Sequence, residues 1–223
     1  MSFEKFTQDF AQLRKFIDDF GAIRILGGEP LLNPEVCEYV KFCRQLYPET
    51  PLHLATNAIL LPKMSDEFFN TIRENNAIIW ISFYPPMQSK MPEIQRLLEA
   101  KRVSYTIGGL VTNFFKNQTL NANATPAENF IKCGWSQCHN FCDGKIAACF
   151  KPFVTKYFNA YYNKNLPEDG ALDLYEEGLT TEKLKAHLQK PFQRCMYCTE
   201  NQSFPWGVVS HPSPLSDWVL DAT

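Results

Sequence analysis

Four short apolar runs in the first half of the chain constrain the fold more than any other feature. They begin at Ile23, Leu52, Ile78 and Val103, and the segments between them carry apolar residues at helical spacing. Strands that alternate with helices at such regular intervals are typical of right-handed strand–helix–strand units with parallel strands. We therefore expect an α/β fold whose sheet forms part of a barrel.

The pattern also predicts the bounds of these elements. Helices are expected over residues 3–20, 34–47, 66–75 and 92–100, and strands over 23–26, 52–55, 78–82 and 103–107. In such folds the chemistry gathers at the C-terminal ends of the strands. The residues expected at these ends are Gly28-Glu29, Thr56-Asn57 and Ser82 to Tyr84.

Composition excludes several classes of partner. The formal net charge is -2 and the sequence pI is about 6.1, without a cluster of Lys and Arg that would bind nucleic acid or an anionic membrane. The longest apolar stretch, residues 77–84, is too short to span a bilayer, and the first residues lack a signal-peptide pattern. We expect a cytoplasmic protein with reduced thiols and without nucleic-acid or membrane partners.

The second half is rich in cysteine. Six of the eight cysteines lie between Cys133 and Cys198, and the last two form a Cys-x2-Cys pair. A 4Fe-4S cluster or a structural zinc ion takes four thiolates, and a two-residue gap lets neighbouring sulfurs bind one centre without strain. The polar stretch 117–127 marks the expected boundary between domains over 1–120 and 121–223.

A hairpin is expected within the cysteine-rich half. Asp143-Gly144 is a favoured two-residue turn, and the register it sets places Cys138 opposite Cys149. Cys138 therefore remains an alternative ligand to Cys133, since five thiols cannot all bind one centre with four ligand positions. Cys37 and Cys43 lie within an expected helix and are interpreted as small buried hydrophobes.

Taken together, these motifs resemble those of the radical S-adenosylmethionine superfamily, in the form that carries a SPASM or Twitch auxiliary-cluster domain. The matching positions are Gly27-Gly28-Glu29-Pro30 after a strand, Thr56-Asn57, Ile81-Ser82, and the set Cys133, Gly144, Cys149, Cys195 and Cys198. The resemblance covers nearly the whole chain. It implies an incomplete parallel (β/α) barrel of the radical S-adenosylmethionine type, followed by a small cysteine-rich α+β domain.

The resemblance also implies site residues and ligands. S-adenosylmethionine would be contacted by Gly27, Gly28, Glu29, Pro30, Asn57 and Ser82, and one auxiliary 4Fe-4S cluster would be bound by Cys133, Cys149, Cys195 and Cys198. Paired glycines let the backbone approach a ligand closely, and a glutamate at a strand end offers negative charge to an ammonium group. The substrate would be a peptide or a small molecule.

The sequence departs from the family in two places. Ala58 stands where a glycine usually follows the Thr-Asn pair, and the C-x3-C-x2-C triplet of the catalytic cluster is missing. Either the sequence lacks an upstream segment, or the protein has lost radical chemistry. We favour the first, because a missing first strand leaves the 23–26 strand with an unpaired edge.

In either case this chain alone is not expected to cleave S-adenosylmethionine, so we assign it no catalytic residue. The alternative function is a non-catalytic interaction module that binds zinc or an iron–sulfur cluster through its four cysteines.

Overall fold

The computed structural model describes residues 1–208 and 212–221, which divide into two compact units. The sheet unit comprises residues 2–7 and 17–112, and the cysteine-rich unit comprises Met1, residues 8–16 and the chain from Asn113 onward. Each unit is described separately. Across the described residues, no helix is long and apolar enough to cross a membrane.

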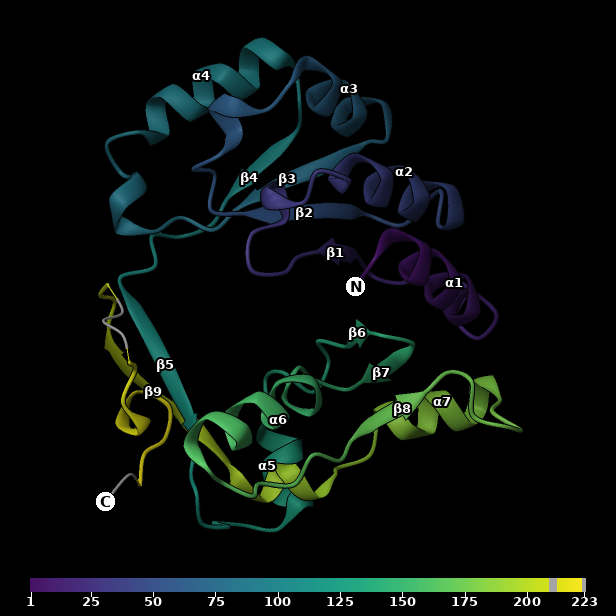
Figure 1. The fold of residues 1–223 in the computed structure, drawn as a ribbon, viewed down its shortest axis with the longest axis vertical. Coiled ribbons are helices and arrows are strands. Elements are labelled where there is room, and N and C mark those ends of the chain that lie inside the picture. The colour runs from purple at the N-terminus through teal and green to yellow at the C-terminus, as the bar shows by residue number, and fades with distance from the viewer. Residues whose placement is uncertain (209–211, 222–223) are drawn as a thin grey trace. The chain divides into compact units, whose positions relative to one another are not determined.

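The sheet unit is built on four parallel strands in the order β1-β2-β3-β4. These strands are β1 (Ile23–Ile25), β2 (Leu52–Thr56), β3 (Ala77–Ile81) and β4 (Tyr105–Ile107). The helices of this unit are α2 (Val36–Leu46), α3 (Asp66–Glu74) and α4 (Met91–Lys101), with short 3-10 turns at η1 (Pro30–Leu32), η2 (Leu61–Lys63) and η3 (Pro85–Met87). Helix α1 (Phe3–Arg14) is divided between the two units after Thr7. Helices α2, α3 and α4 lie along one face of the sheet (Figure 1). The expected α/β class with parallel strands is confirmed.

Alternation along the strands explains why one face carries the helices. In β2, Leu52 and Leu54 are buried whereas His53 is half-buried, and in β3 the buried residues include Ile79 and Ile81. Because successive strand side chains point to opposite faces, the half-buried Ile78 and Trp80 lie on one face, whereas these buried residues share the other. This face forms the core of the unit.

Helix α1 is shorter than its apolar stripe predicts. It begins as expected after Ser2, whose Oγ accepts a backbone N–H, but it ends at Arg14 instead of reaching Phe20. Beyond the helix, the Asp19 carboxylate accepts the Phe20 backbone N–H at 2.8 Å and the Thr50 hydroxyl at 2.6 Å. Aspartate that bonds locally in this way competes with helix formation.

The cysteine-rich unit combines two small antiparallel sheets with short helices. One sheet pairs β5 (Asn113–Gln118) with β9 (Cys198–Pro205), and the other has β6 (Asn140–Cys142), β7 (Lys145–Ala147) and β8 (Ala171–Asp173). The helices are α5 (Pro126–Lys132), α6 (Lys151–Tyr162) and α7 (Thr181–Leu188), with 3-10 segments η4 (Gln193–Tyr197) and η5 (Leu215–Asp217).

The expected turn between β6 and β7 is confirmed. Asp143 and Gly144 have φ values of 49° and 71°, as a two-residue hairpin turn requires. A side chain at Gly144 would also be crowded, because a Cβ there would lie 3.1 Å from the Tyr175 ring and 3.2 Å from the Asp9 carboxylate. Both the backbone conformation and the limited space therefore favour glycine at this position.

Candidate metal centre

The four cysteines predicted as ligands lie at the ends of different elements of the cysteine-rich unit. Cys133 ends α5, Cys149 lies just before α6, Cys195 lies within η4, and Cys198 begins β9. Of these positions, Cys149 lies closest to the N-terminal end of a helix, where the first backbone N–H groups are not used by the helix itself.

These four thiols are near enough to act on one another electrostatically. Burial raises the pKa of Cys149 to about 11 and that of Cys195 to about 12, and the charges of Cys133 and Cys198 raise both further. Burial also raises the pKa of Cys198, with a further contribution from Cys133. The structure thus gathers the four residues in one region. As the side chains stand, no group of three or more His, Cys, Asp or Glu within residues 1–208 and 212–221 is arranged to hold a metal ion.

The other cysteines lie in different surroundings. Cys138 is exposed to solvent, and the β6–β7 ladder ends at the pair Asn140 and Ala147, before it would reach Cys138. Cys43 is buried in α2, and burial raises its pKa to about 12. Cys37 is half-buried in the same helix.

A backbone N–H group donates to one of the four candidate sulfurs, because the Trp135 nitrogen lies 3.4 Å from the Cys133 sulfur. The backbone at Lys151 and at Phe192 lowers the pKa of Cys149 and of Cys195, respectively, against the effect of burial. Donors of this kind favour the thiolate over the thiol. The thiolate is the form of cysteine that binds a metal.

Two buried cations lie beside the same thiols. Lys151 is 8% exposed and Arg194 is 1% exposed, and Gln118 Oε1 accepts from Lys151 Nζ at 2.8 Å and from Arg194 Nη2 at 2.6 Å. Burial lowers the pKa of Lys151 to about 8, whereas the charges of Cys198 and Cys149 act in the opposite direction.

The charge of these two side chains is not balanced by a carboxylate. Among the described residues, neither Lys151 nor Arg194 forms an ion pair with Asp or Glu, and Arg194 Nη1 is buried without a hydrogen-bond partner. Burying an unpaired cation is costly. Once deprotonated, the neighbouring thiols would therefore supply negative charge that balances Lys151 and Arg194.

The loop that carries the last two cysteines is clamped from both sides. Asn129 Nδ2 donates to the carbonyl oxygens of Cys195 at 2.9 Å and Cys198 at 2.7 Å. The Asp169 carboxylate accepts the backbone N–H groups of Gln193 at 2.6 Å and Arg194 at 3.0 Å. These bonds fix the backbone on both sides of the ligand pair.

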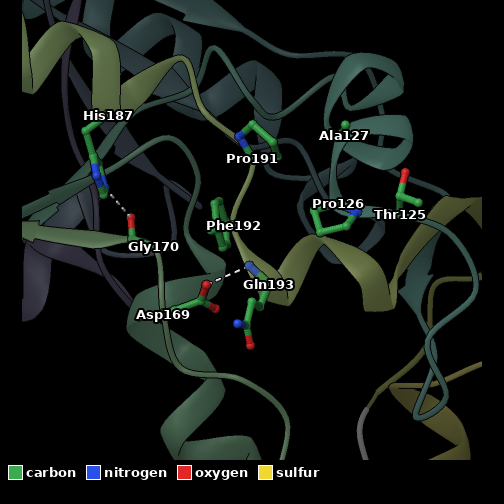
Figure 2. Close-up of a pocket in the computed structure, with 9 residues that line it drawn as sticks. All are labelled: Thr125, Pro126, Ala127, Asp169, Gly170, His187, Pro191, Phe192 and Gln193. Atoms are coloured by element: carbon green, nitrogen blue, oxygen red, sulfur yellow. Dashed lines mark hydrogen bonds between the residues drawn. The ribbon is translucent and has the colours of Figure 1, made fainter.

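A hollow of about 530 Å³ opens beside this loop (Figure 2). Its lining residues are Thr125, Pro126, Ala127, Asp169, Gly170, His187, Pro191, Phe192 and Gln193. Gly170 has a φ of 98°, and a Cβ there would lie 2.6 Å from the Phe192 ring. The hollow is thus shaped by close packing of backbone against an aromatic ring, next to the chain that leads to Cys195.

The second set of predicted residues lies at the strand ends of the sheet unit. Glu29, which follows β1, accepts the Thr56 hydroxyl at 2.7 Å and the Asn57 N–H at 3.0 Å, both at the end of β2. The Ser82 N–H, at the end of β3, donates to the Thr56 carbonyl at 2.8 Å. Glu29, Asn57 and Ser82 are therefore brought to one edge of the sheet, as expected.

The glycines of this loop have open space beside them. Apart from the glycine itself and its neighbours in the chain, no described residue has an atom within 4 Å of a Cβ built on Gly27 or Gly28, and Pro30 begins η1 just beyond. Ala58 has a φ of 67°, a left-handed conformation that favours glycine. Ala58 therefore has a backbone conformation that a glycine would adopt with less strain.

Reasoning from the sequence missed five residues of the cysteine-rich unit that surround the thiols: Gln118, Asn129, Lys151, Asp169 and Arg194. Two of them had a usable signal, because Lys151 and Arg194 are close in sequence to predicted ligands.

In comparisons with known proteins, no family model matches this chain, and no curated protein matches it either.

Proposed function

We propose that this chain is an iron–sulfur protein of the radical S-adenosylmethionine type, and that its cysteine-rich unit binds one 4Fe-4S cluster. Cys133, Cys149, Cys195 and Cys198 would hold the cluster, which when bound supplies one-electron transfer. The chain's part is to offer thiolates, amide donors and compensating charge.

The observation that carries this proposal is the pair of buried cations. Four thiolates around a 4Fe-4S core leave a net negative charge, and Lys151 and Arg194 lie beside those thiols without a carboxylate partner. The Trp135 backbone N–H, which donates to the Cys133 sulfur, supports the same conclusion. Such buried positive charge is costly in a metal-free protein and is balanced in a loaded one.

For the sheet unit we propose binding of S-adenosylmethionine at the strand ends. Glu29 Oε2 accepts a hydrogen bond from the Asn57 backbone N–H, and a carboxylate oxygen can accept a second one from an ammonium group. The space beside Gly27 and Gly28 admits a ligand. Because the sequence has no C-x3-C-x2-C triplet, we do not assign reductive cleavage of S-adenosylmethionine to this chain. The substrate class that we propose is a peptide or a small molecule.

A zinc site is the second candidate, because four thiolates with a Cys-x2-Cys pair also suit a structural zinc ion of similar net charge. Purification of the full chain without oxygen, followed by measurement of iron, zinc and acid-labile sulfide, separates the two. We expect brown protein with about four iron atoms and four sulfides per chain. Colourless protein with about one zinc and no sulfide would favour the zinc module, and protein that takes up neither metal after reconstitution would contradict both.

A further inference from the structure

The two buried cations, Lys151 and Arg194, donate to the same acceptor, Gln118, which pairs with the proposed ligand Cys198 across the β5–β9 sheet. We propose that Gln118, Lys151 and Arg194 form a cation brace that retains the cluster and raises its reduction potential. This inference rests on the proposed function, because it concerns the same centre. In it, Lys151 and Arg194 act through their charge, and Gln118 acts as a positioning residue.

The geometry of the brace begins with strand pairing. Gln118, the last residue of β5, is the register partner of Cys198, the first residue of β9. Its side chain is buried, with the residue 7% exposed, and its Oε1 accepts from both cations. The sheet therefore sets the acceptor, and with it both charges, beside a ligand.

The identity of residue 118 matters as much as its position. A glutamate there would also accept from Lys151 and Arg194, but its charge would cancel part of theirs. The neutral amide of Gln118 fixes both side chains and leaves their positive charge available to the thiolates. Asn117 Oδ1, at 3.1 Å from Lys151 Nζ, adds a second neutral acceptor.

The positive charge of the brace has opposite effects in the loaded and in the metal-free protein. A bound cluster becomes more negative when it gains an electron, and fixed positive charge in a buried, low-dielectric site favours that reduced form. Without the cluster, the same charge is buried and uncompensated, and it destabilises the fold. Removing one cation should therefore stabilise the metal-free protein and disfavour the reduced state of the loaded one.

Three variants of the full chain separate charge from packing. Lys151→Met removes the charge and keeps the length of the side chain, Lys151→Arg keeps the charge, and Lys156→Met removes a charge from an exposed position on the same helix. Each is loaded anaerobically with iron and sulfide, assayed for both, and titrated with dithionite as the electron donor while its spectrum is followed.

We expect Lys151→Met to lower the ratio of reduced to oxidised cluster at a fixed potential roughly tenfold, which is about 59 mV for a one-electron couple. Lys151→Arg and Lys156→Met should remain close to wild type. In the metal-free state, Lys151→Met should need more urea to unfold than wild type, a gain that a purely structural lysine would not give.

The remaining outcomes are also decisive. Full iron content with an unchanged potential in Lys151→Met would overturn the brace while leaving the cluster proposal intact. If Lys151→Met loses its iron, retention by Lys151→Arg supports the role of charge, and equal loss in both variants overturns it. Gln118→Glu is an independent check, because it should lower the potential in the same direction. Wild-type protein that binds no iron would overturn the proposed function and this inference together.

Discussion

The two units of this protein differ in what fills their interiors. The sheet unit is packed with apolar side chains such as Val40, Leu54, Ile72 and Ile79, all 0% exposed. The cysteine-rich unit also buries apolar side chains such as Leu174 and Leu184, but its buried set contains charged and amide side chains as well. These include Gln118, Lys151, Asn159 and Arg194.

This difference separates two sources of stability. Burial of apolar surface stabilises the sheet unit without a ligand, at roughly 25 cal/mol per Å². The cysteine-rich unit buries positive charge around four thiols, so its stability depends on a negatively charged group that balances this charge. We therefore expect metal loss to destabilise the cysteine-rich unit alone and a core mutation in the sheet unit to destabilise the sheet unit alone.

Loss of the metal should produce the largest effect. Cys195→Ala or Cys198→Ala removes a direct bond to the metal, and structural metal sites contribute on the order of 10 kcal/mol to folding. We expect little bound iron, and faster hydrogen exchange and proteolysis from Asn113 onward, with the sheet unit still protected. Cys37→Ala is the matched control and should keep its metal. Unchanged exchange in the cysteine-rich unit would remove the proposed dependence on metal.

A cavity in the core of the sheet unit should destabilise that unit without changing the iron content. Ile79→Ala deletes a fully buried side chain from β3 and should lower the free energy of unfolding of that unit by about 3 kcal/mol. Urea denaturation followed in each unit by hydrogen exchange measures this. The iron content should stay at the wild-type level, and a loss of iron in this variant would show that the units are not independent.

The clamp on the ligand loop should give an intermediate effect. Asn129→Ala removes both hydrogen bonds to the carbonyls of Cys195 and Cys198, and loss of support around metal ligands costs roughly 10- to 100-fold in metal affinity. Competition with a chelator measures the change. Asn70→Ala, which removes an exposed amide from the sheet unit, should leave affinity unchanged. Equal affinity in both variants would mean that the clamp does not support the site.

The smallest effect concerns acid sensitivity of the sheet unit. Burial lowers the pKa of His53 below its ordinary value of 6.5, and the nearby Arg24 adds to this. The unfolded state then binds more protons than the folded state below about pH 6.5, so stability is complete above this pH and is lost as pH falls through the folded pKa. His53→Gln should flatten the dependence of urea stability on pH. An unchanged slope in the variant would assign the acid sensitivity to other groups.

The sheet unit could be predicted largely from its sequence because its elements follow local periodicity. The four strands lie within two residues of their expected bounds, and the main error, the length of α1, arose where the Asp19 side chain bonds to a distant threonine. The Asp143-Gly144 hairpin was also predictable, since its turn chemistry is local.

The cysteine-rich unit was less predictable because its contacts are not local. Helix α6 has no strong apolar stripe and was missed, and α5 begins inside a stretch that only its polar composition had marked. Gln118 meets Lys151 and Arg194 only after the chain has folded, so no sequence window contains all three. The cysteine spacing predicted candidate ligands, but it did not predict the charges around them.

The choice between Cys133 and Cys138 offers the most direct test of the central claim. Cys133 acts electrostatically on Cys149, Cys195 and Cys198, whereas Cys138 is exposed to solvent. The two alanine variants should be reconstituted in parallel with iron and sulfide, and the iron bound per chain measured. We predict that Cys133→Ala loses most of its iron and that Cys138→Ala retains the wild-type amount. Full iron content in Cys133→Ala would contradict the four-cysteine centre.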